Sequence, residues 1–105
     1  MVECQSAWLP YVLDYWTRRL PTYDRRVADN WLRDYRMYTA CQTDEDIAYL
    51  VSRGCEDNLL IGTDFGHSGQ SAELDAVRNL RAKKGVDAGV VDKILCDNPK
   101  AFYGL

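Results

Sequence analysis

The residues with the clearest potential for chemistry are Asp64 and His67, which share one short polar loop. The loop follows Leu59–Gly62, an apolar run that predicts a strand of a parallel sheet covered on both faces. Active sites of α/β proteins form in the loops after the carboxyl ends of such strands. An ionised Asp in that place can ligate a divalent metal or accept a proton from a bound water. A neutral His can ligate the metal or orient a substrate.

Both residues also have plainer interpretations. An Asp between a strand and a helix is often a turn former or a helix cap. His67 is the only histidine of the chain and can equally be a solvated loop residue. One Asp and one His do not complete a site, because catalytic zinc usually takes three protein ligands. The pair therefore predicts at most one part of a metal centre.

The elements that would position this loop alternate between strand and helix. Residues 36–41 predict a half-buried strand before the one at 59–62. Helices are expected at 10–20 and 27–35, after an N-cap at Thr43, at 74–84 and at 90–95. Asn98 and Pro99 are expected as the N-cap and first-turn proline of a last short helix. This order predicts an α/β fold with a parallel sheet in one domain that spans residues 1–105.

Composition places the chain among ordinary globular proteins. It has 105 residues, of which 47% are hydrophobic and 28% are charged. No run approaches the roughly 18 apolar residues of a membrane span, and residues 1–5 lack the features of a secretory signal. We therefore expect a cytoplasmic protein without a membrane partner. Its cysteines form no CxxC pair, and Cys41 and Cys96 are expected as small core residues.

Three segments resemble the amidohydrolase-related family, whose members include aminocarboxymuconate-semialdehyde decarboxylase-like enzymes. Residues 61–67, IGTDFGH, are similar to the family signature G-[ST]-D-[YF]-x-H. Residues 93–105, KILCDNPKAFYGL, are similar to the ending KIL-x-x-N-[AP]-x-x-[LF]-Y-G-L. Residues 3–10, ECQSAWLP, resemble E-[SA]-G-x-x-W-[LV]-P, with Gln5 in place of the glycine. The resemblance spans nearly the whole chain and is stronger after Cys55.

The resemblance implies the C-terminal portion of a (β/α)₈ TIM barrel, about its last two to three β/α units. Asp64 would then be the catalytic and metal-ligating residue of the last strand, with zinc as the expected divalent metal. His67, Trp8 and Glu3 would be substrate-binding residues. Packing for Trp8 and a surface position for Glu3 are the simpler interpretations. The H-x-H ligands that the family carries on its first strand have no counterpart in this sequence.

A whole barrel needs about 250 residues, so the resemblance implies a C-terminal segment of a metal-dependent hydrolase that acts on a small molecule. We expect no catalytic activity from the chain alone. Non-oxidative decarboxylation, which the same family performs, is the alternative reaction. A non-catalytic remnant that self-associates or pairs with a missing N-terminal part is a further alternative, because a piece of a barrel exposes strand edges.

A nucleic-acid-binding module is the last alternative. Six arginines between residues 16 and 38 alternate with Trp16, Tyr23, Trp31, Tyr35 and Tyr38, a composition that can contact phosphates and stack on bases. Three aspartates lie among them, however, and the chain has a net charge of -3. Trp16 also falls on the expected core stripe of the first helix. We therefore expect no nucleic-acid partner.

Overall fold

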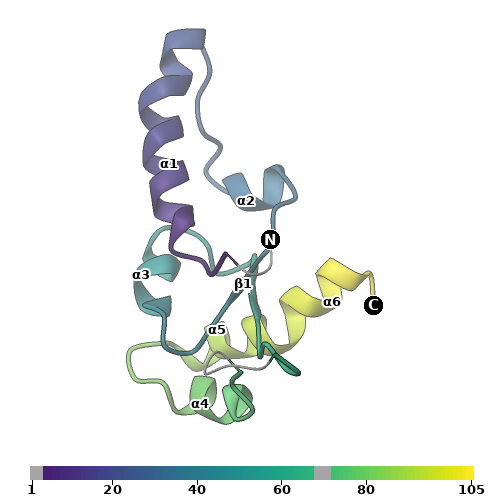
Figure 1. Cartoon of the computed structure of the whole chain (residues 1–105). Coiled ribbons are helices and arrows are strands. Elements are labelled where there is room, and N and C mark those ends of the chain that lie inside the picture. Colours follow the sequence, from purple (N-terminus) through teal and green to yellow (C-terminus); the bar gives the residue numbers. More distant parts are fainter. Residues whose placement is uncertain (1–3, 68–71) are drawn as a thin grey trace.

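Two short strands pair in parallel near the middle of the structure, a computed structural model that describes residues 4–67 and 72–105 (Figure 1). Strand β1 (Thr39–Cys41) lies beside β2 (Leu59–Ile61), with Thr39 opposite Leu59 and Cys41 opposite Ile61. The alternation of strands and helices predicted a parallel pairing, and this is confirmed. Both strands are shorter than the sequence suggested. Whether they belong to a barrel stays a prediction.

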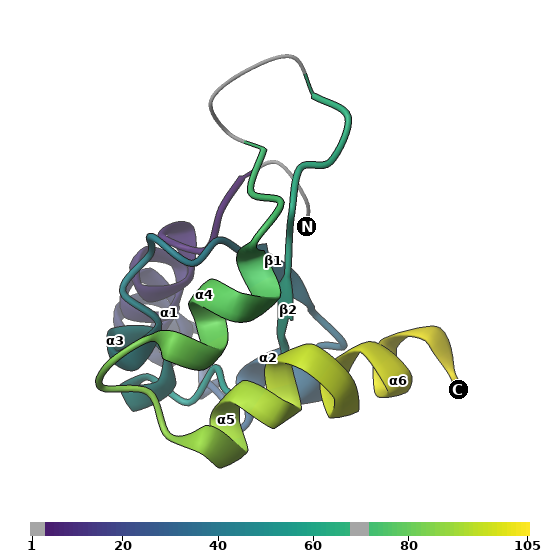
Figure 2. The ribbon, with the colours of Figure 1, turned by 90° about the horizontal axis from the view of Figure 1, so that it is seen from below.

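Helices surround this pair and make up most of the regular structure. The chain begins with α1, which extends away from the sheet, and ends with α6, which projects on the side of β2 (Figures 1 and 2). The elements besides the strands are α1 (Trp8–Arg19), the 3₁₀ helix η1 (Leu20–Tyr23), α2 (Trp31–Asp34), α3 (Ile47–Ser52), α4 (Ala76–Ala82), α5 (Ala88–Asp92), the π-helical turn η2 (Lys93–Asp97) and α6 (Asn98–Tyr103).

The prediction that Thr43 caps the helix after β1 is wrong. Helix α3 starts later, and its N-cap is Asp46, whose carboxylate accepts a hydrogen bond from the Tyr49 amide at 3.0 Å. A shorter helix leaves residues 42–45 free to form a loop at the end of the strand. Gly54 follows the helix and has φ of 76°, a conformation that favours glycine after a helix.

The last helices form one continuous rod instead of separate pieces. Asn98 was expected to cap α6, but its backbone is helical and its side chain is buried. Pro99 cannot donate an amide hydrogen bond inside a helix, and the rod passes through the π-helical turn η2 immediately before it. The side-chain amide of Asn98 therefore does not cap a helix and can bond to another segment of the chain.

The hydrophobic core covers only one face of the strands well. Cys41 and Leu59 are fully buried and pack in one cluster with Leu80 and Ile94 from the later helices. Side chains alternate between the faces of a strand, and Leu60, which points the other way, is only half-buried. The expectation that this strand is covered on both faces is therefore wrong for the structure of this chain.

The four cysteines are free thiols in two environments. Cys41 is buried as expected, and its burial, aided by the charge of Glu45, raises its pKa to about 12. Cys55 is also buried, which raises its pKa to about 11. Cys96 is exposed, so the prediction of a core position for it is wrong. The two buried thiols stay protonated at neutral pH and are poor nucleophiles.

The aromatic residues of the basic segment mostly contact one another. The Trp16 ring meets Trp31 and Tyr35 edge to face, with centroids 5.7 and 5.5 Å apart. Trp31 is fully buried, and Tyr38 packs against Phe102. The Trp16, Trp31 and Tyr35 rings thus form part of the packing between α1 and the segment of α2. In the described part of the chain, no helix is long and apolar enough to cross a membrane.

Polar side chains fix the loop that leads into β2. The Asn98 amide donates to the carbonyls of Glu56 and Leu59, both at 2.8 Å. The Lys93 ammonium contacts the carboxylates of Asp57 and Glu56 at 2.8 and 2.6 Å, and these hydrogen bonds raise its pKa above the usual value. A buried amide and an exposed ion pair thus hold the start of the strand on the final helical rod.

The buried amide predicts a measurable loss of stability. Replacing Asn98 by alanine leaves the carbonyls of Glu56 and Leu59 without their buried donor, and we expect the free energy of unfolding to fall by about 2–3 kcal/mol. Urea denaturation followed by circular dichroism measures this change. The matched control is Asn30→Ala, an exposed residue whose side chain makes no capping bond, with an expected change under about 0.5 kcal/mol. Equal effects of the two substitutions would contradict this role.

Candidate functional site

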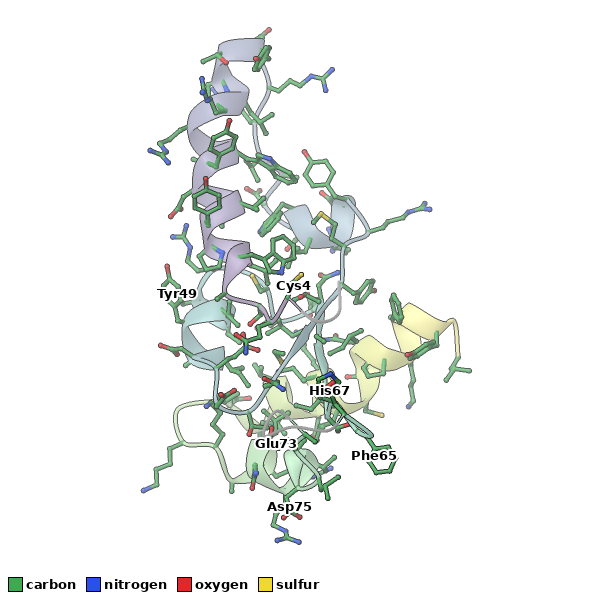
Figure 3. All side chains as sticks on the ribbon, in the orientation of Figure 1. Cys4, Tyr49, Phe65, His67, Glu73 and Asp75 are labelled. Carbon is green, nitrogen blue, oxygen red and sulfur yellow. The ribbon has the colours of Figure 1, made fainter. Side chains whose placement is uncertain are left out.

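The candidate site lies at the carboxyl ends of the two strands, where three segments of the chain come together. They are residues 4–6 before α1, residues 42–46 after β1, and the described part of residues 62–75 after β2. A parallel sheet directs all these loops to the same edge. Figure 3 labels His67, Phe65 and Glu73 in the loop after β2 and Cys4 in the first segment.

Asp64 and His67 face each other across a tight turn. The His67 amide donates to the Asp64 carbonyl at 3.2 Å, and the His67 Nδ1 atom lies 3.6 Å from an Asp64 carboxylate oxygen. Asp64 has φ of 49°, a left-handed conformation that aspartate tolerates better than most residues. Both side chains are exposed, and Phe65 between them points away from the body of the molecule (Figure 3). The turn therefore presents a carboxylate and an imidazole together to solvent.

These two side chains suit a metal in kind but fall short in number. Carboxylate oxygen and imidazole nitrogen are both zinc ligands, and a catalytic site needs a third protein ligand. Among residues 4–67 and 72–105, no group of three or more His, Cys, Asp or Glu side chains is placed to hold a metal ion. A metal centre at Asp64 would need ligands from outside this described set.

The other two predicted substrate-binding residues are Trp8 and Glu3. The Trp8 indole nitrogen donates to the Gln5 carbonyl at 3.1 Å, and its ring packs against the hydrophobic core. These contacts favour the packing interpretation of Trp8. Glu3 lies outside the described residues. A substrate-binding role for either residue stays a prediction.

Gln5 replaces the glycine of the resembled motif at a position where the backbone conformation favours glycine. It stands where the motif has glycine, and its φ is 52°, in the left-handed region that favours glycine. Its side-chain amide lies 3.4 Å from the Gln42 amide oxygen, and its carbonyl accepts from the Thr39 hydroxyl at 3.2 Å. These contacts place the first segment beside the end of β1.

A carboxylate joins the first segment to the loop after β1. One oxygen of Glu45 accepts from the Ser6 amide at 2.8 Å and also from the Ser6 hydroxyl. The other carboxylate oxygen of Glu45 accepts from the backbone amide of Gln42 at 2.7 Å. Ser6 is fully buried, so these bonds satisfy polar groups that would otherwise be costly. We call this arrangement the Ser6–Glu45 clasp.

A second carboxylate joins the loop after β1 to the loop after β2 in the same way. Glu73 accepts from the Thr43 amide at 3.2 Å and from the Thr43 hydroxyl. The Asn79 amide donates to it at 2.8 Å, and the Lys83 ammonium binds the Thr43 carbonyl at 2.6 Å. The Glu73 amide also donates to the Thr63 carbonyl at 2.8 Å. This Thr43–Glu73 clasp fixes the backbone next to Asp64.

The environment of Glu73 favours its ionised form. Its partial burial raises the pKa, but hydrogen bonds from Asn79 and Thr43 and the charge of Lys83 outweigh that effect. The net result is a pKa below the usual value of a glutamate side chain. Glu73 is therefore a charged acceptor at neutral pH, and the clasp is closed under those conditions.

The sequence reasoning missed both clasps. The sequence places Glu45 in the first turn of the helix expected after Thr43 and Glu73 just before the helix expected at 74–84, but α3 and α4 start at Ile47 and Ala76, after these residues. One signal was available, because the segments CQS at 4–6 and CQT at 41–43 place a hydroxyl residue at corresponding positions. The register of the sheet extends this correspondence to Thr63, which stands two residues after Ile61 as Thr43 does after Cys41.

A carboxylate-bearing loop after a parallel strand is an arrangement shared by many α/β enzymes. Comparison with known proteins adds information about the class of protein. No family model matches the chain. Part of it is similar to an N-acetyltaurine hydrolase from Salmo salar, with 38% identity over 65 residues that cover 53% of this chain. The chain spans about a fifth of the length of that relative (19%). Partial similarity to a hydrolase is thus established.

The lowered pKa of Glu73 predicts how stability depends on pH. The clasp stabilises the folded chain above the ordinary glutamate pKa of 4.5, and this stabilisation is lost as the pH falls from there through the lower pKa of the folded state. We expect Glu73→Gln to cost about 1–2 kcal/mol at pH 7 and less at pH 3. Thermal unfolding at both pH values measures the difference.

The control for this experiment is Asp44→Asn, which changes an exposed carboxylate in the loop after β1. It should leave the pH dependence close to that of the parent chain. A Glu73→Gln variant whose stability falls with acid as steeply as that of the parent chain would refute the role of the clasp.

Proposed function

We propose that this chain supplies Asp64 to the active site of a metal-dependent hydrolase that cleaves the amide bond of a small N-acyl compound. The observation that carries the proposal is the position of Asp64, three residues beyond β2 at the carboxyl edge of a parallel sheet. The partial similarity to an N-acetyltaurine hydrolase supports hydrolysis over decarboxylation. In this proposal the two parallel β/α units are the C-terminal part of a (β/α)₈ barrel.

The chemistry assigned to the chain is proton transfer. A divalent metal such as zinc, when bound, polarises the substrate carbonyl and acidifies water. Asp64 presents an exposed carboxylate in the turn after β2, and it accepts the proton of the attacking water as the new C–O bond forms. It then returns this proton to the amine nitrogen as the C–N bond breaks. His67, 3.6 Å from the Asp64 carboxylate, orients it.

The remaining metal ligands come from outside the described residues in this proposal, since those residues contain no third ligand near the pair. The purified chain is therefore expected to be inactive. Metal-dependent amide hydrolysis by the 105-residue chain alone would overturn this expectation.

The decisive experiment is a chimera in which this chain replaces the matching region of the Salmo salar hydrolase. We expect the chimera to hydrolyse N-acetyltaurine and Asp64→Asn to lower kcat by about 10²–10⁴-fold, because it removes the proton acceptor. Asp75→Asn is the matched control, an exposed carboxylate paired with Arg78 at 3.1 Å, and it should retain activity. A folded, active chimera that is insensitive to Asp64→Asn would refute the proposal.

A further inference from the structure

The two clasps follow a single rule. In each, the amide and hydroxyl of a residue in one loop bond to a glutamate in the next loop along the chain: Ser6 to Glu45, and Thr43 to Glu73. The hydroxyl always belongs to the earlier segment and the carboxylate to the later one. Each clasp therefore fastens one segment of the chain to the next at the carboxyl edge of the sheet.

Thr63 occupies the next position in this series. It is equivalent to Thr43 by the register that pairs Cys41 with Ile61. Its carbonyl accepts from Glu73, which belongs to its own loop, but within the described residues its hydroxyl makes no hydrogen bond. The donor that each earlier unit uses to hold its successor is thus available at the end of β2.

The surroundings of β2 suit a further strand. Within the described chain, β2 has a strand partner on one side only, since the sheet order is β1-β2. Helix α6 lies beside the strands and projects outward from them (Figures 1 and 2), and its Phe102 ring packs against Tyr38, just before β1. A strand added beside β2 would pair with the backbone groups at its open edge.

We propose that the open edge of β2 receives a parallel strand whose following loop carries an aspartate or glutamate, and that this carboxylate closes a third clasp on Thr63. This inference rests on the proposed function, because it assigns the occupant to the complementing part of the barrel. The two clasps within the chain argue for this occupant, since they show which group each unit presents to the next. The same edge would then stand beside Asp64 and bring the missing part of the site to it.

Association between separate chains tests this proposal. The probe is the Salmo salar hydrolase with the region matching this chain removed, co-expressed with the full 105-residue chain. We expect the two to co-purify, and Thr63→Val to weaken association about tenfold, as expected for the loss of one hydrogen bond to a charged group. Thr63→Ser keeps the hydroxyl and should bind as the parent chain does.

Two controls separate this effect from misfolding. Thr63→Val should leave the unfolding midpoint of the isolated chain unchanged, whereas Thr43→Val should lower it, because of these two threonines only Thr43 has a bonded hydroxyl within the described residues. Thr22→Val changes a hydroxyl on η1 that bonds to the Arg19 carbonyl, and it should not affect association.

The outcomes also separate this inference from the proposed function. Absence of association, or equal association by the parent chain and Thr63→Val, would overturn the third clasp. A complex that forms and depends on the Thr63 hydroxyl, yet does not hydrolyse N-acetyltaurine, would support the clasp and count against the proposed activity.

Discussion

The parallel pairing of β1 with β2 is the constraint on which the rest of this structure depends. Each strand has three residues, and a two-stranded sheet of that length has little stability of its own. Side chains compensate at both ends. At the amino end, Asn98 and Lys93 hold the loop before β2, and at the carboxyl end Glu45 and Glu73 hold the loops that follow the strands. The sheet is thus fixed more by these polar contacts than by its ladder.

The two ends differ in a way that bears on function. The amino end is fixed by contacts to a continuous helical rod and includes a fully satisfied buried amide. At the carboxyl end, carboxylates connect loop to loop and leave Asp64 and His67 exposed. In α/β barrels the carboxyl end carries the chemistry and the amino end contributes stability. In this chain, too, the contacts at the amino end hold the strands in place, whereas those at the carboxyl end lie beside the candidate site.

Much of the element order could be predicted from the sequence because it depends on local signals. Apolar periodicity located the helices, and the apolar run at 59–62 located β2. The cap at Gly54 followed from the intrinsic preference of glycine for positive φ. Errors arose where a residue had two possible partners. Thr43 and Asn98 are both good N-caps, but each bonds instead to a group about 30 to 42 residues away in sequence.

The candidate site shows the same division between local and distant information. The turn that brings His67 to Asp64 spans three residues, and the loop was identified from its place after a strand. The clasps were not identified from the sequence, because a glutamate next to a predicted helix start has an adequate local explanation. The register of the strands is what makes Thr43 and Thr63 equivalent. The prediction of a core position for Cys96 was wrong for a related reason, since apolar sequence neighbours do not determine which face of a helix is covered.

The direction of the clasps has a consequence for how β/α units of this kind assemble. The earlier segment contributes a backbone amide and the hydroxyl of a short side chain on the same residue, so both donors are positioned once that residue is fixed. The later unit contributes a carboxylate on a flexible side chain, which can reach its donors only when its own strand is in register. A one-residue slip would move the acceptor away from both donors at once and would also reverse the faces of the strand. The clasp therefore favours the correct register at the edge that carries Asp64 and His67, and it links the folding of each unit to the geometry of the candidate site.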